Sequence, residues 1–260
     1  MHGVRAKKFL GQHFLKDQDI ANKIVEALSL EGEDETIIEI GPGPGVLTNF
    51  LLQKTYKEIV LIEIDRESIA WLRKNIDAKN ITIVEGDFLK INIEDLSKSD
   101  LSIIGNFPYN ISSQIFFKIL EQKSKVMEVV CMLQKEVAER ICASHGNKIY
   151  GILSVLIGAY YHTEMLFNVP PNVFIPPPKV DSAVIRLKRK ENISLDCDEK
   201  LFKKVIKQGF QNRRKTLRNA LKPILLPVEL TQDKIFDLRA EQLSVEDYIY
   251  LTQKIQKWKN

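Results

Sequence analysis

The chain has 260 residues, of which 44% are hydrophobic and 28% charged, and this length and composition predict one large domain or one medium domain with a smaller one. Its three cysteines are widely spaced, with no C-x-x-C pair, and no apolar run is long enough for an export signal or a membrane span. These features argue against a disulfide framework, a zinc site and a membrane protein. We therefore expect a cytoplasmic protein with free thiols.

The net charge of +4 is unevenly distributed along the chain. Residues 186–260 hold 18 basic and 10 acidic side chains, or +8, whereas residues 1–185 hold 20 and 24, or −4. A smaller basic cluster lies near the N-terminus, at Arg5, Lys7 and Lys8. This asymmetry indicates either an anionic partner such as nucleic acid or a solvated helical face, and charge alone does not separate the two.

The first expected element is an amphipathic helix over Asp17 to Leu30, capped by Asp17 or Asp19. Short β-branched runs then alternate with helix-like segments, which favours a parallel sheet covered on both faces. These runs are residues 36–40, 58–64, 81–84, 101–104 and 127–133. Two later runs, 165–169 and 183–187, flank the Pro-rich segment PPNVFIPPPKVDS, which we interpret as a loop joining a final pair of strands.

After Lys190 the strand pattern stops and helical patterns follow. One apolar stripe contains Leu201, Phe202, Val205 and Ile206, and residues 244–247 resemble a capping box before a last helix. We expect an α/β domain over residues 1–191 and a small all-helical domain over residues 192–260.

The first chemical motif is IIEIGPGPGVLTNFL, residues 37–51, in which a strand ends, three glycines follow and a helix begins near Val46 or Leu47. Gly41 and Gly43 suit a tight turn whose backbone approaches a ligand, with a helix N-terminus behind it. By itself the motif is a weak signal, and a tight strand-to-helix turn that binds no ligand is the less favoured alternative.

Two carboxylates strengthen the case for a ligand. Glu63 lies at the end of the second strand, where it can accept ribose hydroxyls, and Asp87 ends the third, where it can accept an adenine amino group. Carboxyl ends of parallel strands share one crevice, so an adenosine-containing ligand is expected. The motif is not G-x-G-x-x-G, and Glu39 stands two residues before Gly41; both facts favour S-adenosylmethionine over NAD.

The fourth strand ends in GNFPYNIS, residues 105–112. Asn106 and the Pro108 carbonyl can accept hydrogen bonds from the amino group of a base and hold its nitrogen in line with a methyl group. Tyr109 can stack on a base that has left its helix. The alternative is an ordinary Asn-Pro turn with core aromatics, which the three preceding motifs make less favourable.

In combination, these motifs resemble the KsgA (RsmA) family of ribosomal small-subunit RNA adenine dimethyltransferases over nearly the whole chain. The matching segments, in order, are KKFLGQHFLKD (7–17), EIGPGPGVLT (39–48), NFPYNIS (106–112), FIPPPKVDSAV (174–184) and GFQNRRKTLRNAL (209–221). Two departures are His13, where the family usually has Asn, and Phe107, where it usually has Leu.

The resemblance implies a Rossmann-like enzyme that dimethylates N6 of two adjacent adenines in a hairpin loop near the 3′ end of 16S rRNA. Its partner would be the immature 30S subunit, with no metal, no DNA and no membrane involved, and we expect a monomer. By position, the implied contacts with the cofactor S-adenosylmethionine are His13, Leu15, Gly41, Glu63, Asp87 and Asn106. The implied adenine contacts are Asn106, Pro108 and Tyr109, with Phe174 as a second stacking face.

A basic segment in the helical domain completes the prediction. Arg213, Arg214, Lys215 and Arg218 are expected to contact rRNA phosphates without reading sequence, with solvated surface charge as the alternative. Two rival functions remain: a 23S rRNA adenine dimethyltransferase of the antibiotic-resistance type, and a non-catalytic ribosome-assembly factor. The Pro-rich and basic segments favour the 16S enzyme over the 23S enzyme. The intact Asn-x-Pro-Tyr motif argues against a non-catalytic assembly factor.

Overall fold

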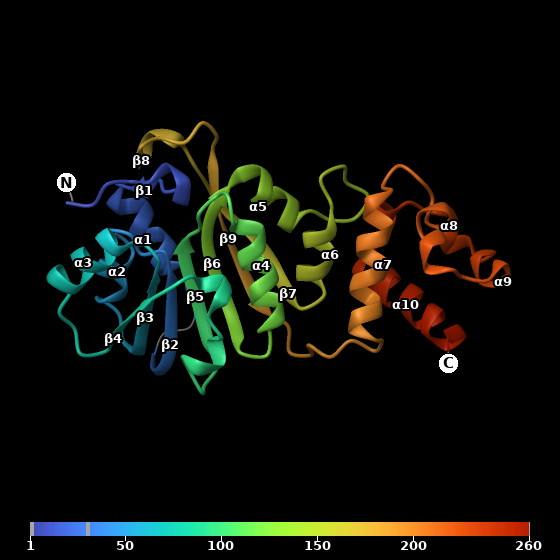
Figure 1. The fold of residues 1–260 in the computed structure, drawn as a ribbon, viewed down its shortest axis with the longest axis horizontal. Helices are drawn as coiled ribbons and strands as arrows, with labels where there is room; N and C mark the ends of the chain where they lie inside the picture. The colour runs from blue at the N-terminus through green and yellow to red at the C-terminus, as the bar shows by residue number, and fades with distance from the viewer. Residues whose placement is uncertain (1–2, 30–31, 260) are drawn as a thin grey trace. The chain divides into compact units, whose positions relative to one another are not determined.

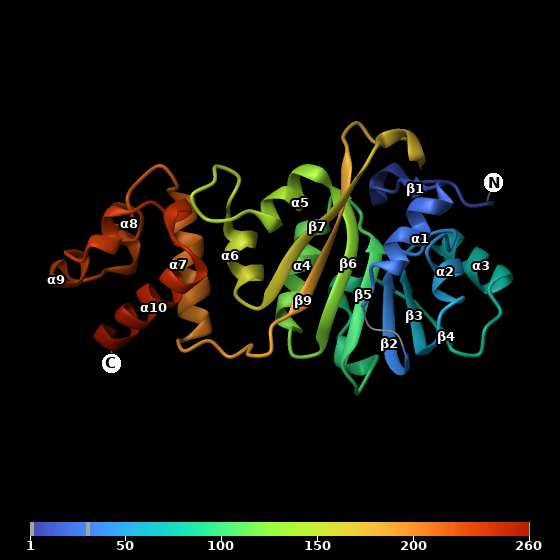
Figure 2. The same cartoon turned by 180° about the vertical axis from the view of Figure 1, so that it is seen from behind.

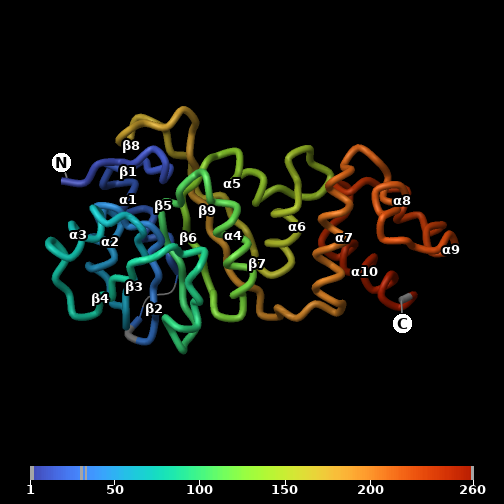
Figure 3. Tube along the Cα trace, viewed as in Figure 1, coloured from blue at the N-terminus to red at the C-terminus, as the bar shows by residue number. Residues whose placement is uncertain are grey.

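The main sheet has seven strands in the order β4-β3-β2-β5-β6-β9-β7. The structure is a computed structural model that describes residues 3–29 and 32–259 (Figure 1, Figure 3). All seven predicted strands are confirmed. Six of them contain the whole predicted range and extend beyond it by one or more residues, whereas β3 begins two residues earlier than predicted and ends one residue earlier. Their bounds are β2 Gly32–Ile40, β3 Tyr56–Glu63, β4 Ile81–Glu85, β5 Leu101–Asn106, β6 Val126–Gln134, β7 Tyr161–Val169 and β9 Ser182–Arg189.

The sheet is mixed, so the prediction of a parallel sheet holds only for part of it. Strands β4, β3, β2, β5 and β6 pair in parallel, whereas β9 runs antiparallel to β6. A parallel return needs a crossover connection, usually a helix. The Pro-rich segment, which joins β7 to β9, contains only a short 3-10 turn and the two-residue strand β8, so no crossover helix links these two strands.

Helices cover both faces of the sheet, as expected: α4 (Ser112–Glu121) lies in front of the sheet, beside β6, in Figure 1, and α1 (Gln18–Glu26) lies over the opposite face in Figure 2. Asp17 caps α1, because its Oδ1 accepts a hydrogen bond from the Ile20 N–H at 3.0 Å. The helix is shorter than predicted, and Leu30 lies outside the described residues. Further helices of this part are α2 (Thr48–Leu51), α3 (Arg66–Asn75) and α5 (Lys135–Cys142).

A second, two-stranded sheet joins the N-terminal segment to the Pro-rich segment. Strand β1 (Phe14–Leu15) pairs antiparallel with β8 (Phe174–Ile175). This pairing was not predicted, because two residues are too few to show a hydrophobic period. It brings the N-terminal segment to the edge of the main sheet where the predicted motifs end.

The chain divides into two compact units, and the boundary differs from the predicted one. The first unit holds residues up to Ala138 together with Thr163–Arg189, and the second holds Glu139–His162 together with Lys190 onward. Most of residues 139–162 thus lie with the helices, because α6 (Ile152–Gly158) packs against α7 and α10, although this segment also holds the end of α5 and the first two residues of β7.

The second unit is helical, as predicted. Its other helices are α7 (Glu199–Gln211), α8 (Leu217–Ala220), α9 (Val228–Thr231) and α10 (Val245–Lys259). In the apolar stripe of α7, Phe202, Val205 and Ile206 are buried. The predicted capping box before α10 is confirmed, since Ser244 and Asp247 each accept the backbone N–H of the other.

Short 3-10 helices complete the described secondary structure, at Lys8–Leu10, Phe88–Lys90, Ile93–Asp95, Pro171–Val173, Lys222–Ile224, Lys234–Asp237 and Ala240–Gln242. Cys131, Cys142 and Cys197 are not joined in disulfide bonds. None of the helices in the described part of the chain is long and apolar enough to cross a membrane.

Candidate active site

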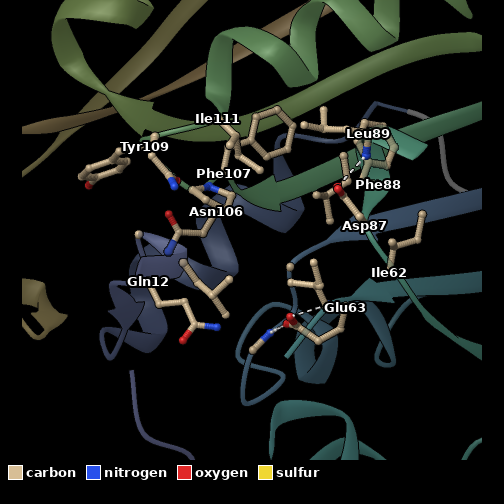
Figure 4. Close-up of a pocket in the computed structure, with 18 of the residues that line it drawn as sticks. Gln12, Ile62, Glu63, Asp87, Phe88, Leu89, Asn106, Phe107, Tyr109 and Ile111 are labelled. Atoms are coloured by element: carbon tan, nitrogen blue, oxygen red, sulfur yellow. Dashed lines mark hydrogen bonds between the residues drawn. The ribbon is translucent and has the colours of Figure 1, made fainter. Parts of the chain in front are cut away.

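A pocket of about 210 Å³ opens where the carboxyl ends of β2, β3, β4 and β5 meet. Figure 4 shows side chains from these strand ends facing it from several sides. The predicted residues that line it are His13, Gly41, Gly43, Glu63, Asp87, Asn106, Pro108 and Tyr109. Four motifs that are far apart in the sequence therefore converge on one space, as the parallel-sheet argument predicted.

The glycine turn forms one wall of this pocket. Gly41, Gly43 and Gly45 have φ angles of 65°, 54° and 80°, a region that side-chain-bearing residues rarely adopt. A Cβ at Gly43 would also lie 2.8 Å from the ring of Phe14. Glycine is therefore required at position 43 both for the backbone conformation and for the packing of the N-terminal segment against the turn.

Glu63 is buried and holds the surrounding backbone in place. Its Oε2 accepts the Gly43 N–H at 3.0 Å, and its Oε1 accepts the Ile64 and Asp65 N–H groups at 2.9 Å each. Burial raises the pKa of Glu63, although the three backbone hydrogen bonds oppose this rise. A carboxylate has about four acceptor sites, so Glu63 keeps capacity for a ligand hydroxyl while it fixes the turn.

Asp87 faces the pocket from the end of β4 (Figure 4). Its Oδ1 accepts the Leu89 N–H at 3.0 Å and so caps the 3-10 helix Phe88–Lys90. This bond fixes the side chain and leaves Oδ2 as an acceptor for a ligand. Phe88 and Leu89 also line the pocket and give this end an apolar wall, which the sequence did not indicate.

Asn106 is the last residue of β5, and its amide is oriented by the N-terminal segment. Its Nδ2 donates to the backbone carbonyl of His13 at 2.7 Å. Because a carbonyl can only accept, the amino group of Asn106 must face His13, and Oδ1 remains to accept a hydrogen bond in the pocket. The sequence predicted Asn106 but not the partner that orients it.

Pro108 and Tyr109 follow Asn106 in the turn before α4. The Pro108 carbonyl accepts the Ile111 N–H at 3.2 Å and keeps a second lone pair. The Tyr109 hydroxyl lies 2.5 Å from Ser182 Oγ, and its ring stacks on the His13 ring with centroids 5.3 Å apart. Burial raises the pKa of Tyr109, with the Ser182 hydrogen bond opposing it, so the hydroxyl is neutral at physiological pH.

The N-terminal segment is anchored over the pocket by Asp65, two residues beyond Glu63. Lys7 Nζ forms an ion pair with Asp65, and Gln12 Nε2 donates to it at 3.4 Å. Burial alone would raise the pKa of Asp65, but the hydrogen bonds from Lys7, the Glu67 N–H and Gln12 outweigh it and lower the pKa. His13 Nδ1 bonds the Pro176 carbonyl at 2.7 Å and so links this segment to the Pro-rich segment.

Two predicted contacts are placed elsewhere. Leu15 lines a smaller cavity beside the main pocket, together with Glu39, Gly41 and Asn106. Phe174 lines neither cavity and is only 1% exposed, as part of the hydrophobic core. The expectation of a second stacking face at Phe174 is therefore wrong for this conformation: side chains alternate along a strand, and in β8 the exposed one is Ile175.

Phe9 is a pocket residue that the sequence argument missed. It lines the opening from the 3-10 helix Lys8–Leu10 and is 77% exposed. Phenylalanine side chains are usually buried, so an exposed one at the mouth of a cavity indicates a contact with a ligand and not a role in the core. The signal was available in KKFLGQHFLKD, where Phe9 lies within a basic stretch with no apolar period around it.

The predicted phosphate-binding cations lie in the second unit: Arg213, Arg214 and Lys215 follow the end of α7, and Arg218 is in α8. Arg213 pairs with Glu241 at 3.6 Å, and Arg218 pairs with Asp237 at 2.8 Å. Arg214 and Lys215 are exposed in the turn between α7 and α8. The four cations are thus surface groups, and two of them already have an acidic neighbour.

Comparisons with known proteins agree on one family. The model of the ribosomal RNA adenine dimethylase family matches residues 3–257. The "Ribosomal RNA small subunit methyltransferase A" of Flavobacterium johnsoniae is 57% identical over 98% of both chains. The protein of the same name from Cytophaga hutchinsonii is 52% identical over 98% of this chain and 99% of that protein.

Solved structures show the same fold. A dimethyladenosine transferase from Plasmodium falciparum superposes with a TM-score of 0.84 and 28% identity, over 94% of this chain and 98% of that one. The 23S rRNA methyltransferase ErmE superposes with a TM-score of 0.73 over 94% of this chain and 99% of that one; at 22% identity this likeness shows the fold alone. With its glycine turn, strand-end carboxylates and oriented asparagine in one pocket, the chain belongs to the ribosomal RNA adenine dimethylase family.

Proposed function

We propose that the protein transfers methyl groups from S-adenosylmethionine to N6 of two adjacent adenines in a hairpin loop near the 3′ end of 16S rRNA. Its family and its relatives named as small-subunit methyltransferases support the reaction and the rRNA substrate. The observation that carries the proposal is the fixed amide of Asn106, which faces the pocket that Glu63 and Asp87 also line.

The main pocket fits the adenosine end of the cofactor. Glu63 and Asp87 present carboxylate oxygens at neighbouring strand ends, which suits ribose hydroxyls and an adenine amino group. The backbone at Gly41 and Gly43 has no side chain to keep a ligand away. We assign the adenosine contacts to these four residues.

The smaller cavity fits the amino-acid end of the cofactor. It is lined by Leu15 and Glu39, and it shares Phe14, Gly41 and Asn106 with the main pocket. His13 lies at this end of the main pocket and contributes its backbone to the orientation of Asn106. When bound, S-adenosylmethionine supplies a methyl group on a positively charged sulfur, which is the leaving centre of an in-line displacement.

The catalytic task of the chain is to present the adenine nitrogen to that methyl group. The lone pair of an exocyclic amino group is delocalised into the ring, which makes the nitrogen a weak nucleophile. Asn106 Oδ1 and the Pro108 carbonyl accept its two hydrogens, which holds the nitrogen in line and favours a tetrahedral lone pair. Tyr109, braced by His13 and Ser182, stacks on the extruded base.

The helical unit is the proposed rRNA-positioning surface. Arg214 and Lys215 are exposed, and Arg213 and Arg218 lie near them in sequence. Phosphate contacts of this kind position an RNA without reading its sequence and weaken as salt rises. The RNA is proposed to be presented by the immature 30S subunit to a monomer of this protein in the cytoplasm, with no membrane or DNA involved.

Incubation with tritiated S-adenosylmethionine tests the proposal and its rivals together. One reaction contains immature 30S particles and the other contains naked 23S rRNA. We expect label in the 16S rRNA of the particles, and label in 23S rRNA alone would support the antibiotic-resistance type instead. Particle binding without label in either RNA would support a non-catalytic assembly factor.

A further inference from the structure

Glu39 is a buried acid whose surroundings differ from those of Glu63. It lies near the end of β2 and is 1% exposed, and its Oε2 accepts a hydrogen bond from Thr48 Oγ1 at 2.7 Å. Glu63, on the neighbouring strand, accepts three backbone N–H groups. A carboxylate with three amide donors is stabilised as an anion, whereas one hydroxyl offers far less.

The groups packed around Glu39 offer no positive charge. Its cross-strand neighbours are Leu61 on β3 and Ile104 on β5. Among the described residues, the small cavity beside it is lined by apolar side chains, the glycine turn and the amide of Asn106, without a lysine, arginine or histidine. The titratable group that acts on Glu39 is Glu63, whose negative charge repels a second one.

Electrostatics therefore favour the neutral form of Glu39 in the absence of a ligand. Burial raises the pKa of Glu39 to about 8, with the Thr48 hydrogen bond opposing the rise and Glu63 adding to it. The proposed function places Glu39 in the lining of the smaller cavity but gives its proton no role.

The cavity next to Glu39 has the size and position for a small cationic group. Its volume is about 30 Å³, which corresponds to about two water-sized groups. It shares Phe14, Gly41 and Asn106 with the main pocket, so a ligand that fills the main pocket can extend into it. The amino-acid end of S-adenosylmethionine carries an ammonium group of this size.

We propose that Glu39 is protonated in the cofactor-free protein and releases its proton to solvent when the cofactor's ammonium group enters the cavity beside it. The O–H bond of the acid breaks, the carboxylate pairs with the ammonium, and the proton passes to the buffer. This inference rests on the proposed function, because it takes S-adenosylmethionine as the ligand. It adds that cofactor binding is linked to the loss of one proton from one named residue.

The linkage makes affinity depend on pH in a defined direction. When binding releases one proton, the association constant rises about tenfold for each pH unit below the pKa of the acid. The rise ends near pH 8, because an α-amino group loses its own charge at a pKa of about 7.7–8.0. Cofactor affinity is therefore expected to increase about tenfold between pH 6 and pH 7, to rise less steeply above pH 7 and to level off near pH 8.

Isothermal titration calorimetry measures the released proton directly. The purified full-length protein is titrated at pH 6.5 with S-adenosylhomocysteine, which keeps the ammonium group and cannot react. Three buffers of different ionisation enthalpy are used, and the slope of observed enthalpy against ionisation enthalpy gives the proton number. We expect about one proton released by the wild type and about one fewer by Glu39→Gln.

A truncated ligand separates the two ends of the site. Methylthioadenosine contains the adenosine and sulfur but no amino acid, so it fills the main pocket and leaves the cavity beside Glu39 without a cation. The wild type is expected to bind it and to release about one proton fewer than with S-adenosylhomocysteine. This comparison uses the wild type alone and so decides the matter even where Glu39→Gln does not fold.

The inference would be overturned if the wild type released equal numbers of protons with S-adenosylhomocysteine and with methylthioadenosine. It would also be overturned if the wild type and Glu39→Gln released equal numbers with S-adenosylhomocysteine. Either result would leave the proposed function intact. Absence of binding by both S-adenosylmethionine and S-adenosylhomocysteine would instead contradict the proposed function. Difference infrared spectroscopy supplies the matching signature. The carbonyl band of a protonated acid should disappear when cofactor binds to the wild type, and no such loss is expected in Glu39→Gln.

Discussion

The two units of the chain present their functional groups in different ways. At the pocket of the first unit the backbone fixes the polar side chains: Glu63 accepts three N–H groups, and Asn106 donates to a carbonyl. In the second unit the cations are exposed or held by surface ion pairs, such as that of Arg218 with Asp237. A polar group fixed by the backbone can hold the reacting atoms in a defined geometry, whereas an exposed surface cation mainly attracts the RNA. Changes at the pocket should therefore cost more than changes in the helical unit.

The largest effect is expected for Asn106→Ala. The change removes the Oδ1 acceptor, so the amino nitrogen is no longer held in line. Methyl transfer should fall about 10²–10³-fold, as for the loss of one positioned hydrogen-bonding group in other active sites. The measurement is the rate of tritium incorporation into rRNA. Asn75→Ala, which removes an exposed amide at the end of α3, is the matched control and should retain full activity.

Glu63→Gln should weaken cofactor binding by about 10-fold to 100-fold, because charged hydrogen bonds contribute about 1.5–3 kcal/mol each. The amide oxygen can still accept the Ile64 and Asp65 N–H groups, whereas the amide nitrogen cannot accept the Gly43 N–H, so part of the loss is expected to arise through the glycine turn. Titration calorimetry with S-adenosylhomocysteine gives the affinity, and circular dichroism checks the fold. An unchanged affinity in a folded variant would show that Glu63 only supports the glycine turn.

Replacement of both Arg214 and Lys215 by Gln tests the helical unit. Binding to immature 30S particles should weaken by roughly tenfold, and the slope of log affinity against log salt should become shallower by about one for each cation that no longer neutralises a phosphate. The double variant Lys57→Gln and Lys79→Gln removes two exposed cations from the first unit. If both pairs lower affinity equally, general charge and not this segment is responsible.

His13→Asn restores the residue usual in the family and should have a small effect on activity, of a few-fold. The backbone carbonyl that orients Asn106 remains, while the ring that stacks on Tyr109 and bonds the Pro176 carbonyl is removed. Such a stacked pair contributes about 0.5–1.5 kcal/mol. We expect the effect in the KM for RNA and not in cofactor affinity. A comparable decrease in cofactor affinity would place the His13 ring in the cofactor site.

A last prediction concerns stability without ligand and not activity. The pKa of Glu39 is raised on folding from 4.5 to about 8. The folded state therefore binds more protons than the unfolded state between these values, and stability falls as pH rises through that window. Glu39→Gln removes this dependence, so its Tm should exceed that of the wild type by at least about 2 °C at pH 8 and by less at pH 5. A constant difference across pH would contradict the raised pKa.

The sequence predicted the strand ends well because each carries a short, strongly patterned run. Glu63, Asp87 and Asn106 each follow such a run, and parallel strands must end at a common edge. Position along the chain was therefore enough to place them in one pocket. The capping box at Ser244 could be predicted for a similar reason, since it depends on residues three apart.

Contacts made across long sequence separations could not be predicted in this way. Nothing local in the sequence links His13 to Asn106, 93 residues away, or Tyr109 to Ser182, 73 residues away. The error at Phe174 has the same origin, because the two-residue strand that turns this side chain into the core exists only through its pairing with β1. Short sequence motifs indicated which side chains reach the pocket. Hydrogen bonds and strand pairing between distant segments determine how each side chain is oriented.

Mapping of methylated adenines tests the central claim most directly. Immature 30S particles from cells that lack this protein are incubated with S-adenosylmethionine and either the wild type or Asn106→Ala, and the rRNA is analysed by mass spectrometry of defined fragments. We predict two adjacent dimethyladenosines in a hairpin loop near the 3′ end of 16S rRNA with the wild type, and almost none with Asn106→Ala. Dimethyladenosine at another site, or equal yields from both proteins, would contradict the account.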